Sequence, residues 1–151
     1  MKKNKTIYVP MGADIIHTGH LNIIKKAKKY GEIVIGLFTD SAIAEYKTLP
    51  LINYSQRLEI MKNIKGISKI IKQDTWDYSN NLNKLKPNYV IHGDDWKKGI
   101  QQKTRLNVIK LLKRWKGRLI EVPYTKKVNI NENKKNLNNI FHNPETRVSR
   151  L

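Results

Sequence analysis

The alternation of short apolar runs with helical patterns is the feature of this sequence that most restricts its fold. Five apolar runs have the length and composition of buried strands, at residues 6–9, 32–38, 68–72, 89–92 and 119–122. Amphipathic helical patterns or short capped segments lie between successive runs. Strands that alternate with helices predict an α/β fold with a mainly parallel sheet. We therefore expect a Rossmann-like, doubly wound five-stranded sheet in the order 3-2-1-4-5.

Length and composition limit the chain to one main domain. The 151 residues with 39% hydrophobic content suit a single buried core. We expect that domain over residues 1–128, followed by a peripheral helix or linker over residues 129–151, where the sequence becomes polar and rich in asparagine. No apolar run reaches the length of a membrane span, no signal peptide precedes the first strand, and cysteine is absent. These features predict a cytoplasmic protein without a membrane partner.

The charge of the chain is strongly positive. A formal net charge of +18 suggests a polyanion or a phosphorylated small molecule as partner. The lysines are scattered over nearly every element, however. Arginine is sparse, although it is the residue that commonly forms bidentate hydrogen bonds with bases and phosphates. We therefore expect most of the charge to be solvated surface and predict no nucleic-acid partner, although basic binding of DNA or RNA stays an alternative.

A short motif, His17-Thr18-Gly19-His20, follows the first predicted strand and begins the first helix. Free backbone N–H groups and the helix dipole attract anions at such a position, and two imidazoles at i and i+3 would complete a polyphosphate cradle. Gly19 would allow close approach of a ligand. Two other interpretations stay open: a chance motif in a loop, and a zinc site, which would need further ligands that this cysteine-free chain does not obviously supply.

A second polar loop follows the fourth predicted strand, at Gly93-Asp94-Asp95-Trp96. In the expected order, strands one and four are neighbours at the switch point, so this loop and the histidine motif would face one crevice. Asp94 could accept from a base amino group, hold Mg²⁺ or simply cap backbone. Trp96 could stack on a base or fill the core.

Two basic residues are further candidates for phosphate contacts. Lys47 lies in a predicted loop, residues 47–53, where it could fold over a bound phosphate or be an ordinary surface lysine. Arg57 lies near the start of a predicted helix, where it could reach a phosphate or pair with a surface acid.

Taken together, these motifs resemble the cytidylyltransferase family, which includes glycerol-3-phosphate and phosphocholine cytidylyltransferases. The resemblance rests on Asp14 before the His-x-Gly-His motif, Lys47, Tyr54-Ser55-Gln56-Arg57 and Gly93-Asp94-Asp95-Trp96, in that order. Within the family, segments 13–17, 46–51 and 92–97 are most similar to the nucleotidyltransferase domain fused to phosphoenolpyruvate mutase in phosphonate biosynthesis. By that resemblance, residues 144–151 would lead into a mutase domain.

The resemblance implies a reaction in which a phosphonate or phosphate oxygen attacks the α-phosphorus of CTP and pyrophosphate leaves, with Mg²⁺ neutralising the triphosphate. The acceptor would be a small phosphonate of the 2-aminoethylphosphonate or 2-hydroxyethylphosphonate type, and the protein a homodimer. Carried onto this chain, the catalytic residues would be His17, His20 and Lys47, and the substrate-binding residues Arg57 and Asp14. The nucleotide-binding residues would be Met11, Gly12, Ala13, Asp14, Gly19, His92, Gly93, Asp94, Trp96, Tyr124, Thr125 and Asn129, and no protein side chain is assigned as a metal ligand.

Two segments depart from the family pattern, and the first is near the first strand, where Pro10 and Gly12 replace the more usual arrangement with an earlier glycine. Residues 124–130 lack the glycine and the two later hydroxyls of the family signature, although Asn129 could still cap a helix. This departure keeps a nucleotide-binding domain without turnover as an alternative. An adenylyltransferase is a further alternative, because related nucleotidyltransferases share the His-x-Gly-His loop.

Overall fold

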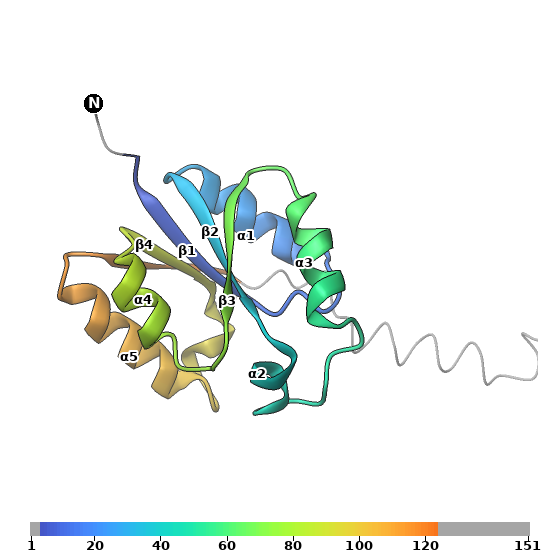
Figure 1. Ribbon diagram of the computed structural model, residues 1–151. Helices are drawn as coiled ribbons and strands as arrows, with labels where there is room; N and C mark the ends of the chain where they lie inside the picture. The colour runs from blue at the N-terminus through green and yellow to red at the C-terminus, as the bar shows by residue number, and fades with distance from the viewer. Residues whose placement is uncertain (1–3, 124–151) are drawn as a thin grey trace, which may run out of the picture.

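The expected sheet is present. A computed structural model describes residues 4–123 of the chain, and its five strands are all parallel and lie in the order β3-β2-β1-β4-β5, as predicted (Figure 1). The strands are β1 (Thr6–Met11), β2 (Glu32–Phe38), β3 (Ile67–Gln73), β4 (Tyr89–Gly93) and β5 (Arg118–Val122).

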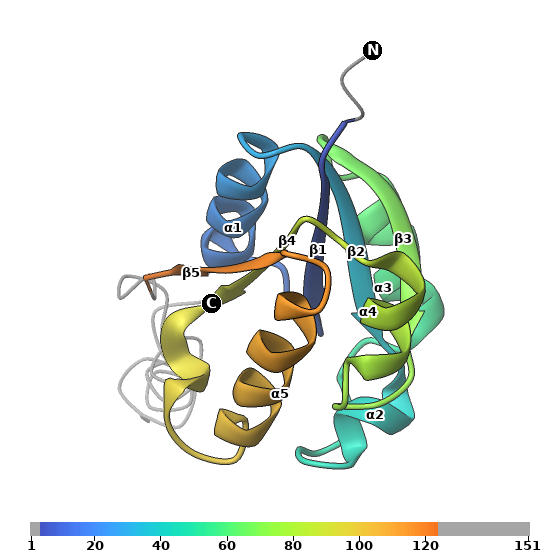
Figure 2. The same ribbon diagram turned by 90° about the vertical axis from the view of Figure 1, so that its left-hand side faces the viewer.

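Helices cover both faces of the sheet. They are α1 (Thr18–Lys28), α2 (Asp40–Ala44), α3 (Tyr54–Lys62), α4 (Ser79–Leu85) and α5 (Gln102–Lys113), with a short 3₁₀ helix η1 (Asp94–Lys97) after β4. The two views show α1 and α3 on one face and α4 and α5 on the other (Figure 1, Figure 2). None of the helices in the described range 4–123 has the length and apolar character needed to cross a membrane.

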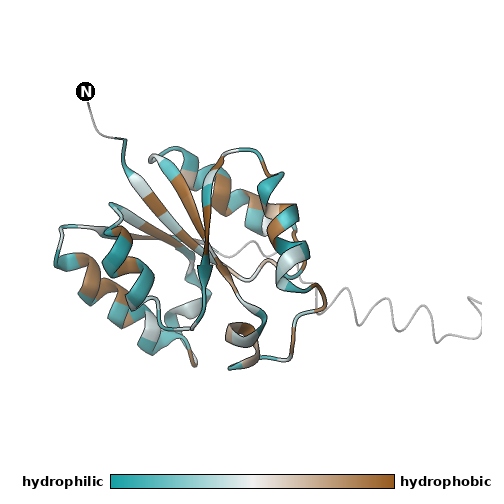
Figure 3. Ribbon diagram, in the orientation of Figure 1, coloured by the Kyte–Doolittle hydropathy of each residue, from teal (hydrophilic) through white to brown (hydrophobic). Residues whose placement is uncertain are grey.

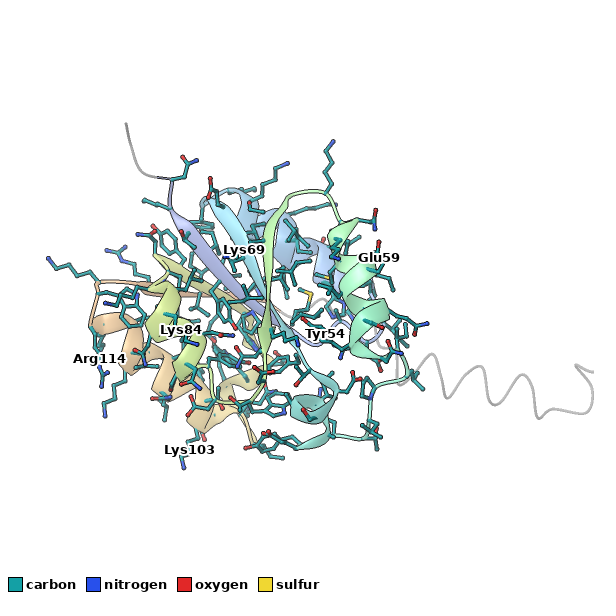
Figure 4. All side chains as sticks on the ribbon, viewed as in Figure 1. Tyr54, Glu59, Lys69, Lys84, Lys103 and Arg114 are labelled. Atoms are coloured by element: carbon teal, nitrogen blue, oxygen red, sulfur yellow. The ribbon has the colours of Figure 1, made fainter. Side chains whose placement is uncertain are left out.

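Each face of the sheet has its own apolar core. Successive side chains of a strand point to opposite faces, so Tyr8 packs towards α4 and α5 while Ile7 and Val9 pack towards α1 and α3. The central strands are therefore apolar on both sides, which explains the nearly continuous hydrophobic runs in the sequence (Figure 3). Lys103 and Arg114 of the α5 region point away from the sheet (Figure 4).

A buried polar network connects the edge strand β3 to the central strand β1. The Tyr8 hydroxyl donates to the Gln73 side-chain carbonyl, and Asn81 Nδ2 of α4 donates to both, at 3.2 Å and 2.9 Å. Burial raises the pKa of the Tyr8 phenol, so it stays a neutral donor. Gly36 on β2 lies directly beneath the Tyr8 hydroxyl, where a Cβ atom would collide with it.

Two element ends differ from the sequence prediction. Strand β1 continues through Pro10 and Met11, which the sequence placed in a loop. Pairing of β1 with β4 ends at Tyr8 and Val90, so Pro10 lies beyond the ladder that its missing N–H would interrupt. Helix α5 ends at Lys113, and the chain then turns at Lys116 in the left-handed conformation (φ +61°), a position where glycine is the usual residue.

Candidate functional site

A cavity of about 460 Å³ lies at the carboxyl ends of β1 and β4, where the two strands separate. Its volume is within the range of about 300–1,000 Å³ that is usual for small-molecule sites. Much of its wall comes from the β1–α1 loop, the chain after α2, the loop after β3 and the end of β4. The predicted site residues on its wall are Met11, Gly12, Ala13, Asp14, His17, Gly19, His20, Lys47, His92 and Gly93.

His17 and His20 form a reciprocal cap at the first turn of α1. Nδ1 of His17 accepts a hydrogen bond from the Gly19 backbone N–H (3.0 Å), and Nδ1 of His20 accepts one from the His17 N–H (3.3 Å). In a neutral imidazole the proton must then be on Nε2. Both rings therefore carry an Nε2–H donor at a helix N-terminus on the cavity wall.

Both histidines are neutral at neutral pH. Burial lowers the pKa of His17, and burial together with the neighbouring His17 lowers the pKa of His20 to about 4. The ring centroids are 4.0 Å apart, so two imidazolium charges would repel strongly. The pair therefore acts through hydrogen-bond donation and not as a pair of cations.

The β1–α1 loop leaves open space on the side of the cavity. Ala13 is buried and has φ +55°, a left-handed conformation that costs a residue with a Cβ about 1–2 kcal/mol. Gly12 needs no such conformation, and a Cβ there would meet only Ile43, another residue of the cavity wall, at 3.9 Å. The glycine thus leaves space on the cavity side that the protein does not fill.

Asp14 and Arg57 connect this loop to neighbouring segments of the chain. The Asp14 carboxylate accepts from the Ile52 N–H (2.9 Å). Arg57 is completely buried: Nη1 donates to the carbonyls of Gly12 and Phe38 (2.7 Å each), Nε to that of Ile52 (2.9 Å), and Nη2 pairs with Asp40 (2.6 Å). One guanidinium therefore ties together the β1–α1 loop, the end of β2 and the segment before α3.

This placement changes the interpretation of Arg57. The sequence prediction made it a substrate-binding residue, but it is absent from the cavity wall and its N–H groups are directed at protein carbonyls and Asp40. In this arrangement Arg57 positions the loops that form the site and does not reach a phosphate. Its partner acid, Asp40, is 37% exposed.

The β4 wall is built around His92. Its ring stacks on Trp96 at 3.7 Å between centroids and 5° between planes, and its Nδ1 lies 2.8 Å from the Gly93 carbonyl oxygen. Burial lowers the pKa of His92. Trp96 is 1% exposed and donates from Nε1 to Glu121 (3.3 Å), so it supports His92 from the core and does not itself line the cavity.

The acidic pair after β4 is divided between two environments. Asp95 lines the cavity and is 60% exposed, whereas Asp94, the predicted nucleotide contact, is absent from the cavity wall. The sequence prediction named Asp94 and not Asp95, because the sequence pattern does not show which carboxylate the turn of η1 directs towards the cavity. Asp95 Oδ1 lies 3.9 Å from Nδ1 of His92.

Another part of the cavity wall is aromatic and carries a single lysine. Among the described residues, Lys47 is the only lysine or arginine on the wall, and its Nζ lies 5.9 Å from the centre of the Trp76 ring. Trp76 and Tyr78 also line the cavity, and their Nε1 and hydroxyl atoms are buried without a hydrogen-bond partner in the described part of the chain. Sequence reasoning missed these two aromatics, although their position just after β3 was a usable signal.

Some predicted site residues cannot be placed. Tyr124, Thr125 and Asn129, and the predicted peripheral segment 129–151, lie outside the described residues. Within residues 4–123 there is no group of three or more His, Asp or Glu side chains that could hold a metal ion alone.

Comparison with known proteins identifies similar sequences. The family model described as cytidylyltransferase-like matches residues 13–143. An FAD synthase of Archaeoglobus fulgidus is 31% identical over 100 residues, which are 62% of this chain and 73% of that protein. An ethanolamine-phosphate cytidylyltransferase of Dictyostelium discoideum is 30% identical over 96 residues, which are 62% of this chain but only 27% of that protein.

Solved structures support the fold. A lipopolysaccharide core biosynthesis protein from Thermoplasma volcanium superposes with a TM-score of 0.67 at 21% identity, over 82% of this chain and 98% of that one. At this identity the likeness concerns the fold only.

Proposed function

Because this chain belongs to the cytidylyltransferase-like family of nucleotidyltransferases, we propose that it transfers CMP from CTP to a small phosphonate or phosphate monoester, with release of pyrophosphate. The acceptor we favour is of the 2-aminoethylphosphonate or 2-hydroxyethylphosphonate type. The observation that carries the proposal is the His17–His20 cap, which presents two neutral Nε2–H donors at a helix N-terminus inside a cavity of nucleotide scale.

The proposed chemistry is a direct displacement. An oxygen of the acceptor forms a bond to the α-phosphorus of CTP, the bond from that phosphorus to its bridging oxygen breaks, and pyrophosphate leaves. The Nε2–H groups of His17 and His20 donate to oxygens on which negative charge increases in the transition state. Lys47, which also lines the cavity, neutralises the anionic acceptor.

Mg²⁺ enters this proposal with the substrate. The described residues form no metal cluster of their own, and Mg²⁺ commonly binds through substrate phosphates with few protein carboxylates. The ion would therefore arrive as the magnesium complex of the nucleotide and neutralise its triphosphate.

A second candidate is adenylyl transfer from ATP, which the likeness to FAD synthases favours. The two candidates share the phosphate cradle and differ in the base and the acceptor. A pyrophosphate-release screen separates them: CTP and ATP are each offered with a panel of phosphonates, phosphate monoesters and flavin mononucleotide. We expect turnover with CTP and a small phosphonate or phosphate ester.

The controls for this screen follow from the site. Turnover should depend on Mg²⁺ and should be lost in His20→Ala. Turnover of ATP with the flavin alone would replace the leading proposal by the second, and nucleotide binding without any turnover would favour a domain that has lost catalysis. The family resemblance also implies a homodimer, which light scattering tests directly.

A further inference from the structure

The three histidines on the cavity wall do not present the same chemistry. We infer that His92 reads the exocyclic amino group of the nucleobase through the lone pair on its Nε2, and so selects cytosine or adenine over uracil or guanine. This inference rests on the proposed nucleotide transfer and adds to it a residue that determines base specificity.

The hydrogen bond to Gly93 fixes the tautomer of His92. A carbonyl oxygen can only accept, so the contact of 2.8 Å requires the proton on Nδ1. Partial burial lowers the pKa of the ring, which is therefore neutral at neutral pH, and Nε2 is then left with a lone pair. No hydrogen bond joins Nε2 to any other residue in the range 4–123, which leaves this acceptor for a ligand.

The direction of that lone pair is fixed as well. The face of the imidazole lies flat on Trp96, whose Nε1 donates to Glu121. Arg105 in turn holds Glu121 through two nitrogens, with Nη2 to Oε1 at 2.7 Å. The ring is thus held on one face by the indole and on one edge by the Gly93 carbonyl, so it cannot turn to offer an N–H instead.

The surroundings of His92 suit an uncharged group and not a phosphate. Of the cavity residues, Gly93 and Asp95 lie next to His92, whereas Lys47 lies on the segment after α2. In the proposed mode of binding, the Nε2–H groups of His17 and His20 donate to the phosphates. The Nε2 acceptor of His92 is then available to the base. A phosphate oxygen would place its own lone pairs against Nε2 and be repelled.

An amino group is the base feature that this acceptor distinguishes. N4 of cytosine and N6 of adenine are donors, whereas O4 of uracil and O6 of guanine are acceptors at the corresponding edge. A buried acceptor that faces another acceptor loses its hydrogen bond and gains repulsion. Discrimination of about 10- to 100-fold is the expected scale for one such contact.

Titration calorimetry with CTP, UTP, ATP and GTP, each with Mg²⁺ and without acceptor, tests this inference. For the wild type we expect CTP to bind at least tenfold more tightly than UTP. His92→Phe keeps an aromatic ring on Trp96 and removes the lone pair, and we expect it to bring CTP and UTP within about threefold of each other. Thermal unfolding of each variant establishes that it is folded.

Two further variants make the result specific. His20→Ala is the matched control, because it removes a histidine from the phosphate side and should weaken CTP and UTP by the same factor. His92→Gln should restore part of the preference, since its amide oxygen can accept. His92→Leu, which also lacks an acceptor, replaces His92→Phe if that variant does not fold. An unchanged CTP-to-UTP ratio in the folded variant, or a wild type that binds UTP as tightly as CTP, would overturn the inference.

The measurement is independent of turnover. If no acceptor reacts, the proposed function fails while base selection is still measured from binding alone. If turnover is present but the ratio does not respond to His92, only the specificity inference fails.

Discussion

The two walls of the cavity use the same side chain in opposite ways. On the β1–α1 wall, backbone N–H groups donate to Nδ1 of His17 and His20, so both rings become donors at Nε2. On the β4 wall, a backbone carbonyl accepts from Nδ1 of His92, so that ring becomes an acceptor at Nε2. The difference shows that the backbone group offered to Nδ1, and not the residue type, decides what a neutral histidine presents to a ligand.

We expect the largest loss of stability from substitution of Arg57. Its hydrogen bonds hold the β1–α1 wall of the cavity, and none of them reaches the β4 wall. Arg57→Met leaves buried carbonyls and Asp40 without their partner, and we expect a loss of about 3–5 kcal/mol in the free energy of unfolding. Urea denaturation measures it. Lys62→Met, on the same helix but in an exposed pair with Glu59, is the matched control and should change stability by less than about 0.5 kcal/mol. Equal effects of the two substitutions would refute the bracing role.

His20→Ala tests the donor wall directly. If Nε2–H meets transition-state charge, kcat should fall by about 10²- to 10³-fold. The preference for CTP over UTP should not change, because that property belongs to the β4 wall. Steady-state rates with both nucleotides provide the readout, and a rate within a few-fold of the wild type would return the motif to a purely structural role as a helix cap.

Acid should weaken the donor wall through His20. Its pKa is about 4 in the folded protein against 6.5 as the usual value, so the unfolded chain takes up the proton more readily. The contribution of His20 to the free energy of unfolding is therefore fully present above about pH 6.5 and is lost as the pH falls towards 4. At pH 5 the loss from this group alone is about 2 kcal/mol. Urea denaturation at pH 7.5 and 5 measures the change. His20→Gln keeps the capping geometry but does not titrate, and it should lose correspondingly less; an identical loss would contradict the lowered pKa.

The smallest effect is expected at Ala13, where the β1–α1 wall carries strain that the β4 wall lacks. Ala13→Gly removes the strain of the left-handed conformation in the folded state but raises the conformational entropy of the unfolded chain. We expect the free energy of unfolding to rise by about 0.5 kcal/mol as the net result. Thermal unfolding would detect it as a small rise in Tm. A clear loss of stability would mean that the packing of the Ala13 methyl outweighs the backbone strain.

The sequence was a good guide to the sheet and to the loops at its carboxyl ends. Hydrophobic periodicity and strand–helix alternation are local and strong, so they predicted the order of the strands and the convergence of the histidine motif with the β4 loop. Whether Arg57 faces a phosphate or three carbonyls depends on contacts over up to 45 residues, which no local pattern records. The turn that directs Asp95, and not Asp94, towards the cavity is also not visible in a local pattern. Nor is the burial of Trp96, whose hydrogen-bond partner Glu121 comes from the last strand.

The contact between Tyr8 and Gly36 has a consequence for how this sequence can vary. The phenol that binds Gln73 and Asn81 extends over β2 only because position 36 has no side chain. A larger residue at 36 would have to be accompanied by a shorter one at 8, and the edge strand would then lose its anchor. Among natural relatives these two positions should therefore change together or not at all, as one inherited unit that lies in two separate strands.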